Sequence, residues 1–118
     1  MTSAKSLGET LRDARVAAGL GLRELAKRAD IAPSYLSDIE NDRRVPAEEL
    51  LRSLASLLKL DFNDLMALAG RVGDQAERYL RKEPYAGVLF RRLAEKRVPE
   101  ERLKELLEEV ERDGKKKR

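Results

Sequence analysis

Residues 22–41 of this chain read LRELAKRADIAPSYLSDIEN, and this stretch decides the fold. The spacing of its apolar residues predicts two short helices, at about 22–29 and 33–41, joined by the tight turn Asp30-Ile31-Ala32. Pro33 favours a helix start there, because the N–H that proline lacks would have no intrahelical partner in the first turn. The stretch therefore predicts a helix–turn–helix pair.

Such a pair must be held at a fixed crossing angle, and the sequence supplies the means. Ala26 is small enough for the second helix to cross the first closely, and Asp30 tolerates the unusual φ that the turn needs. Apolar anchors on both helices face inward, namely Leu25, Ile31, Leu36 and Ile39. Two helices arranged in this way form a device for DNA recognition, in which the second helix enters the major groove.

Apolar residues recur at helical spacing on both sides of the pair. One helix is expected at about 7–18, before Gly19, and two follow the pair. The first of these begins near Pro46, and the second is capped by Asp61 and ends at Gly70. Because β-branched and aromatic residues are few, we expect an all-α domain of five helices over residues 7–70.

The composition changes after residue 70, and residues 71–114 are predicted to be a helical extension. Helices are expected at about 74–82, from Pro84, and from about 98 onward. In the last helix four apolar residues lie at i, i+3, i+4 and i+7 and form one narrow stripe: Leu103, Leu106, Leu107 and Val110.

This apolar stripe allows two interpretations. It can fold back on the fourth and fifth helices of its own chain, or it can pack against the same helix of a second subunit. A narrow stripe on a helix that is otherwise charged favours an interaction role. We therefore interpret the extension as a surface for dimerisation or for binding a protein partner.

The composition excludes much of enzyme chemistry. The 118 residues contain no His and no Cys, which removes imidazole bases, thiolate nucleophiles and the common metal ligands. We expect no enzyme, no cofactor and no metal site. The sequence contains no targeting signal and no apolar run near the roughly 20 residues of a membrane span, so we expect a soluble, cytoplasmic protein without a membrane partner.

The formal charge of +3 comes from the end of the chain. Residues 1–70 carry 10 Lys and Arg against 11 Asp and Glu, a net charge of −1. The last four residues, 115–118, supply +4 by themselves and are expected to be a disordered basic tail. Alternatively, this tail acts as an arm that contacts phosphates or an acidic partner.

Residues 22–41 resemble the helix-turn-helix of the Xre, or Cro/cI-repressor-like, family. The pair Leu25-Ala26, the run Pro33-Ser34-Tyr35-Leu36-Ser37 and the pair Ile39-Glu40 carry the resemblance, which covers about residues 7–70. It implies a five-helix lambda-repressor-like domain. It also implies a dimeric transcriptional repressor that places the helix at 33–41 in the major groove of a palindromic DNA operator.

The family pattern also implies which residues contact DNA. Base edges are assigned to Pro33, Ser34, Ser37 and Asp38. Phosphates are assigned to Arg23, Lys27, Tyr35, Arg43 and Arg44. Asp38 can accept a hydrogen bond from cytosine N4, or it can face solvent or pair with Arg43 instead.

The sequence departs from the family pattern at several positions. Gly21 and Leu22 replace the usual cap and glutamine, Ala32 replaces a common serine cap, and Asp30 and Asp42 stand where glycine is usual. These acidic residues and the neutral domain predict weak nonspecific affinity for DNA. They also leave an alternative function open. In that alternative the chain is an interaction adaptor, or an antitoxin-type regulator whose C-terminal helices bind a toxin or a metallopeptidase.

Overall fold

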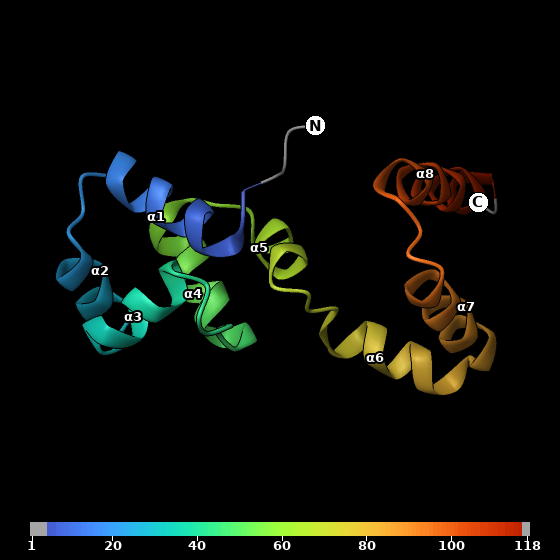
Figure 1. Cartoon of the computed structure of the whole chain (residues 1–118), viewed down its shortest axis with the longest axis horizontal. Helices are drawn as coiled ribbons and strands as arrows, with labels where there is room; N and C mark the ends of the chain where they lie inside the picture. Colours follow the sequence, from blue (N-terminus) through green and yellow to red (C-terminus); the bar gives the residue numbers. More distant parts are fainter. Residues whose placement is uncertain (1–4, 117–118) are drawn as a thin grey trace. The chain divides into compact units, whose positions relative to one another are not determined.

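The computed structural model describes residues 5–116, with side chains described as far as Gly114. All elements in this part of the chain are α-helices, as the all-α prediction required (Figure 1). They are α1 (Leu7–Ala17), α2 (Leu22–Arg28), α3 (Pro33–Glu40), α4 (Glu48–Leu58), α5 (Phe62–Leu68), α6 (Gly73–Lys82), α7 (Pro84–Glu95) and α8 (Glu100–Lys116).

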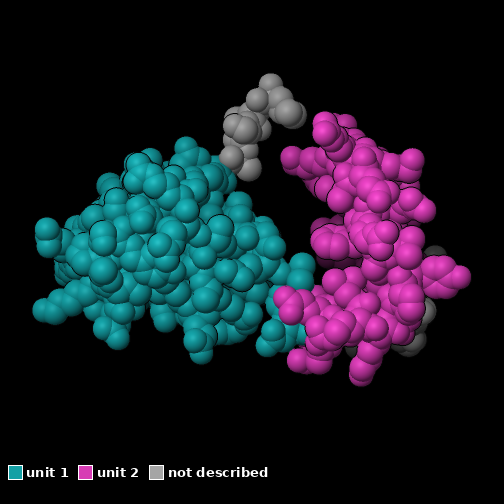
Figure 2. Space-filling view, turned by 60° about the horizontal axis from the view of Figure 1, so that its bottom comes forward, with its two compact units in different colours: residues 1–74 teal, residues 75–118 magenta. Residues whose placement is uncertain are grey.

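The chain divides into two compact units, Met1–Asp74 and Gln75–Arg118 (Figure 2). The first unit contains the five helices α1–α5. The second contains α7, α8 and most of α6. Helix α8 continues to Lys116, whereas the predicted basic tail begins at residue 115. Lys117 and Arg118 lie outside the described residues.

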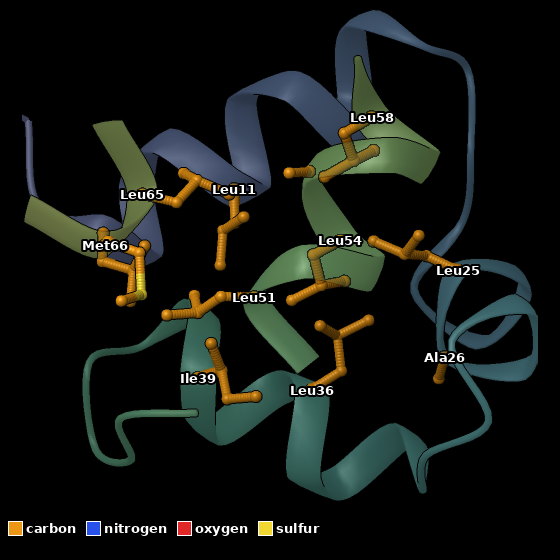
Figure 3. Packing of buried hydrophobic residues seen from close by; sticks show 12 residues of the cluster. Leu11, Leu25, Ala26, Leu36, Ile39, Leu51, Leu54, Leu58, Leu65 and Met66 are labelled. Atoms are coloured by element: carbon orange, nitrogen blue, oxygen red, sulfur yellow. The ribbon is translucent and has the colours of Figure 1, made fainter. Parts of the chain in front are cut away.

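The first unit is built around one apolar core to which all five of its helices contribute (Figure 3). Helix α3 packs against both α1 and α2, and α4 packs against α1 and α5. Fully burying one leucine side chain stabilises a fold by about 1.5–3 kcal/mol, so this cluster holds the motif helices firmly. Its buried members are Leu7, Leu11, Leu25, Ala26, Leu36, Ile39, Leu51, Leu54, Ala55, Leu58, Leu65 and Met66.

Both motif helices end in a residue with left-handed backbone conformation. Asp30, after α2, and Asp42, after α3, each have φ of 60°. In each case the following residue donates its N–H back into the helix, with Ile31 bonded to the Ala26 carbonyl and Arg43 to the Asp38 carbonyl. The sequence prediction that position 30 adopts an unusual φ is confirmed, and the short side chain of Asp makes this conformation accessible.

Gly8 marks the closest approach between α1 and the end of α3. It is buried, and a Cβ placed there would lie 2.4 Å from the Glu40 carbonyl oxygen and 2.7 Å from the Ile39 carbonyl oxygen. Both obstacles are backbone atoms, which cannot move aside as a flexible side chain can. The contact therefore requires a residue without a side chain at position 8.

We predict that Gly8→Ala destabilises the first unit by about 1–3 kcal/mol, because the added methyl forces α1 away from α3. Urea unfolding followed by circular dichroism measures the effect. Gly87→Ala is the matched control, since a Cβ at position 87 in α7 meets no atom within 4 Å. That control should keep or raise stability through its better helix propensity. Equal stability of Gly8→Ala and the unchanged chain would contradict the close contact.

Candidate nucleic-acid interface

The outward face of α3 presents small polar side chains. Ser34 is exposed, and Ser37 and Asp38 are half-buried. The three residues stand at i, i+3 and i+4, so they share one side of the helix. Pro33 opens the helix at its first position, beside Ser34. The structure thus brings the four residues assigned to base edges onto one short segment.

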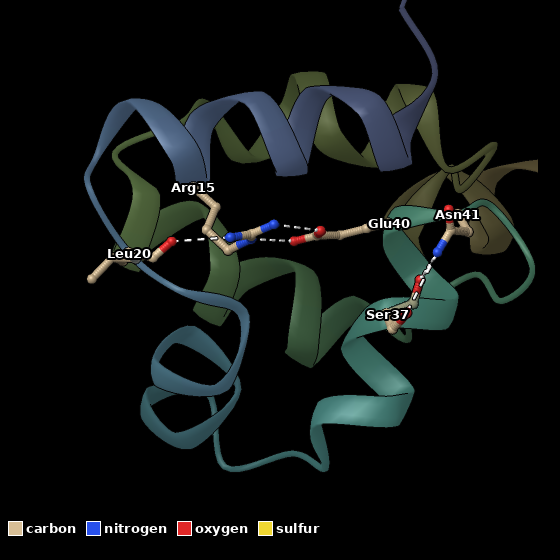
Figure 4. Close-up of polar contacts among 5 residues, drawn as sticks. All are labelled: Arg15, Leu20, Ser37, Glu40 and Asn41. Atoms are coloured by element: carbon tan, nitrogen blue, oxygen red, sulfur yellow. Dashed lines mark hydrogen bonds and ion pairs between the residues drawn. The ribbon is translucent and has the colours of Figure 1, made fainter.

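Asn41 adds a contact that the sequence analysis did not identify. Its side-chain amide donates to the Ser37 carbonyl oxygen at 2.8 Å and approaches the Ser37 hydroxyl oxygen at 3.4 Å (Figure 4). The Ser37 hydroxyl oxygen can therefore accept a hydrogen bond from the Asn41 amide. Its own proton remains free to be donated to a group outside the helix. Asn41 occupies the C-cap of α3, where a short amide side chain reaches back one turn.

The segment after α3 carries Arg43 and Arg44, and α3 itself holds both guanidinium groups. The Arg43 Nη1 atom lies 3.5 Å from the Asp38 carboxylate. The Arg44 guanidinium carbon lies 5.0 Å from the centre of the Tyr35 ring, a cation–π geometry. Of the alternatives for Asp38, the structure without DNA shows the ion pair with Arg43.

The same segment is anchored at both of its ends. The Asp42 carboxylate accepts hydrogen bonds from the Ser6 hydroxyl at 2.6 Å and from the Gly8 N–H at 2.9 Å, at the start of α1. The Pro46 carbonyl accepts one from the Arg71 Nε atom at 2.8 Å. Asp42 was noted in the sequence only as a departure from glycine. Its role depends on a contact with residues more than 30 positions away, which no local pattern reveals.

The basic residues of α2 lie on the helix surface. Arg23 and Lys27 are exposed and stand at i and i+4, so they share one face. The neighbouring Arg28 pairs instead with Glu24 at 2.8 Å. As the sequence indicated, neither α2 nor α3 has a side-chain hydrogen bond at its N-cap, because Gly21 and Ala32 stand there.

A buried ion pair links α1 to the end of α3 (Figure 4). Arg15 donates from Nε to one oxygen of Glu40 at 2.7 Å and from Nη2 to the other at 3.0 Å, and its Nη1 atom donates to the Leu20 carbonyl at 3.0 Å. The two side chains are only 13% and 4% exposed. The hydrogen bonds to Glu40 raise the pKa of Arg15 above its ordinary value.

In the sequence, Glu40 stands out only as part of the motif, without an assigned partner. One available signal was its position four residues after Leu36, on the inward side of the helix. A carboxylate on a core-facing side needs a basic partner, but the sequence alone offers many arginines.

A family model described as a helix-turn-helix domain matches residues 6–73. The chain belongs to the helix-turn-helix family. Among its family relatives is the transcriptional regulator ClgR of Mycobacterium tuberculosis, 36% identical over 78 residues, or 66% of this chain and 70% of ClgR. The regulator DdrOP3 of Deinococcus deserti is 42% identical over 69 residues, or 58% of this chain and 54% of DdrOP3. The resemblance to Xre-like transcriptional regulators is thereby confirmed.

Parts of the chain are also similar to solved structures. ClgR from Corynebacterium glutamicum matches with 32% identity and a TM-score of 0.49, over 74% of this chain and 85% of that protein. SinR, solved in complex with DNA, matches with 31% identity and a TM-score of 0.48, over 51% of this chain and 97% of that protein.

Within residues 5–116 of our chain, no helix combines the length and apolar character that crossing a bilayer requires.

We predict that Arg15→Met destabilises this helix-turn-helix domain by about 3–5 kcal/mol, because it leaves the Glu40 carboxylate buried without a partner. The double variant Arg15→Met/Glu40→Leu should recover part of the loss, since both charges are then removed. Urea unfolding of all variants measures these differences. Arg28→Met is the matched control, because it removes only an exposed pair and should cost about 0.5 kcal/mol or less. A similar small loss for Arg15→Met would show that the buried pair contributes little.

Proposed function

We propose that this helix-turn-helix regulator is a dimeric, sequence-specific repressor that places α3 in the major groove of a palindromic operator. The observation that carries the proposal is the outward face of α3. It presents Ser34, Ser37 and Asp38 on one side of the helix, with two arginines held beside it. Its close relatives are named as transcriptional regulators, which agrees with this role.

Base readout in this proposal comes from short polar side chains. The hydroxyls of Ser34 and Ser37 can each donate to or accept from a base edge. Pro33 lies at the N-terminal end of α3, the end that approaches the bases in this mode of binding. Asp38 accepts from cytosine N4 when it exchanges its pairing with Arg43 for the base.

Phosphate contacts position the domain on the duplex. Arg43 and Arg44 contact the DNA phosphates from the end of α3. Arg23 and Lys27 contact them from α2, and Tyr35 contacts one through its hydroxyl group. The whole of residues 1–70 carries a net charge of −1, so placed cations rather than overall charge attract the DNA. Such a domain binds random DNA weakly, and a larger share of its affinity then depends on sequence.

A dimer completes the proposed repressor. Two copies related by a twofold axis present two α3 helices to half-sites about 34 Å apart, one turn of the duplex. The apolar stripe of α8 supplies the contact between copies. Its members are Leu103, Leu106, Leu107 and Val110.

We predict different DNA-binding defects for Ser37→Ala and Arg44→Ala. Loss of the Ser37 hydroxyl should change sequence preference, by about 1–3 kcal/mol at the base it contacts. Loss of Arg44 should weaken binding to all sequences and reduce the slope of log K against log salt by about one. Titrations with DNA from upstream of the protein's own operon and with a random duplex measure both effects. If the unchanged protein binds both duplexes alike at moderate salt, the proposed function is wrong.

We predict that Tyr35 acts partly by holding Arg44. Tyr35→Phe keeps the ring beneath the guanidinium and loses only the hydroxyl, whereas Tyr35→Leu loses both. Tyr35→Leu should therefore bind the operator more weakly than Tyr35→Phe. This difference should vanish in the Arg44→Ala background, because the ring then has no cation to hold. Equal losses for the two substitutions in the unchanged background would assign the whole effect to the hydroxyl.

A further inference from the structure

The second unit leaves its apolar side chains uncovered. None of the side chains described between residues 75 and 114 is buried. On α7, Tyr85, Val88 and Leu89 form a stripe at i, i+3 and i+4 and are 46% to 89% exposed. On α8, the exposed fractions of Leu103, Leu107 and Val110 range from 42% to 66%.

Helices of this length need a packing partner to be stable. Isolated helices shorter than about 12–15 residues are marginal in water, and most helix stability in proteins comes from burying an apolar face. Helix α7 has 12 residues, and α6 has 10. Two exposed apolar stripes on consecutive helices therefore indicate a surface that has no packing partner within this unit.

The charges of this unit are divided between its two halves. Residues 75–98, which include α7, contain seven Lys and Arg against three Asp and Glu, a net charge of +4. Residues 99–114, which belong mainly to α8, contain three Lys and Arg against seven Asp and Glu, a net charge of −4, and the last four residues, 115–118, add +4. The basic segment 75–98 is thus complementary to the acidic segment 99–114, and in a twofold symmetric contact each segment of one copy can face the other segment of the second copy.

We infer that α8 of one copy docks its apolar stripe on α7 of a second copy, and that the second copy makes the same contact in return. This inference rests on the proposed dimer and names the surfaces that form it. On α7, a shallow hollow lined by Val88, Arg91, Arg92 and Glu95 lies beside the apolar stripe and can receive a side chain of α8. The acidic borders of α8 then lie near the arginines of α7.

Contact between two α8 helices fits the charges less well. Glu100 precedes Leu103 by three residues, and Glu111 follows Leu107 by four, so both carboxylates border the stripe. Two α8 helices facing each other would bring these carboxylates together, and like charges across an interface are destabilising. Against α7 of the second copy, the same carboxylates can reach Arg91, and also Arg92 if it exchanges its present partner Glu95, which lies 3.2 Å away on the same helix.

The turn between the two helices is fixed and does not bring their stripes together within one chain. Arg97 adopts a left-handed conformation with φ of 49°, and Val98 donates its N–H to the Leu93 carbonyl at 3.1 Å. Pro99 then accepts from the Leu103 N–H at the start of α8. With this turn in place both stripes remain exposed within the second unit.

Charge reversal in the 118-residue chain tests the inference. Variant A is Arg91→Glu/Arg92→Glu, and variant B is Glu100→Lys/Glu111→Lys. The matched control is Glu101→Lys/Glu108→Lys, which makes the same change in charge on the opposite side of α8. Sedimentation equilibrium gives the dimer Kd of each variant, native mass spectrometry gives the composition of mixtures, and circular dichroism checks helix content.

Variants A and B should each raise the dimer Kd at least about tenfold, because like charges then meet at both copies of the contact. Mixing A with B should restore dimers of one A and one B, and the control should change the Kd far less. If variant B alone formed tighter dimers while the dimer Kd of variant A stayed unchanged, the inference would be overturned. The contact would then lie between the two α8 helices. Failure of the mixture to form heterodimers, or an unchanged chain that stays monomeric, would also overturn it.

Engineered cysteines provide a measurement that does not depend on charge reversal, because the chain has no cysteine of its own. A Leu89→Cys copy mixed with a Leu107→Cys copy should form a disulfide between α7 and α8 faster than either copy forms one with itself. Faster linkage of Leu107→Cys to itself would overturn the inference. The DNA titrations are independent of both tests, so a chain that dimerises in this way but binds no operator refutes the proposed function alone.

Discussion

Arg15 and Glu40 meet inside the first unit although 25 positions separate them, and the orientation of α3 depends on their contact. The guanidinium binds both oxygens of the carboxylate and also the Leu20 carbonyl, so one side chain ties α1, the following loop and the end of α3 together. Removal from water makes each charge costly alone, and the pair is stable only while both partners are present. The geometry of the proposed DNA-binding surface therefore depends on two residues that face away from it.

Other contacts between α1 and α3 reinforce this constraint. Gly8 lets the two helices approach until backbone meets backbone, and Asp42 binds the start of α1 through both carboxylate oxygens. The residues that follow α3 are consequently held before any ligand arrives. A surface prepared in this way loses less conformational entropy when it binds, which favours affinity from few contacts.

Charged side chains are distributed differently in the first unit and in the extension. The first unit is nearly neutral, and its basic side chains lie at separate positions around α3. This arrangement suits recognition of a particular DNA sequence better than general attraction to DNA. The extension keeps strong charges of both signs in separate segments and exposes its apolar side chains. The first arrangement agrees with reading a DNA sequence, and the second with recognising another copy of the same chain.

The helices, the left-handed turn at Asp30 and the cap at Asp61 can be predicted from local sequence alone, because each depends on residues within a few positions. Local sequence also determines which face of α3 points outward, since helical periodicity fixes that choice. The partners of Glu40, Asp42 and Arg44 become known only from the folded chain. Some of these contacts join residues that are far apart in the sequence, and the others join a cation to one of several possible neighbours. The spacing of residues in the sequence does not show which of these neighbours the fold brings into contact.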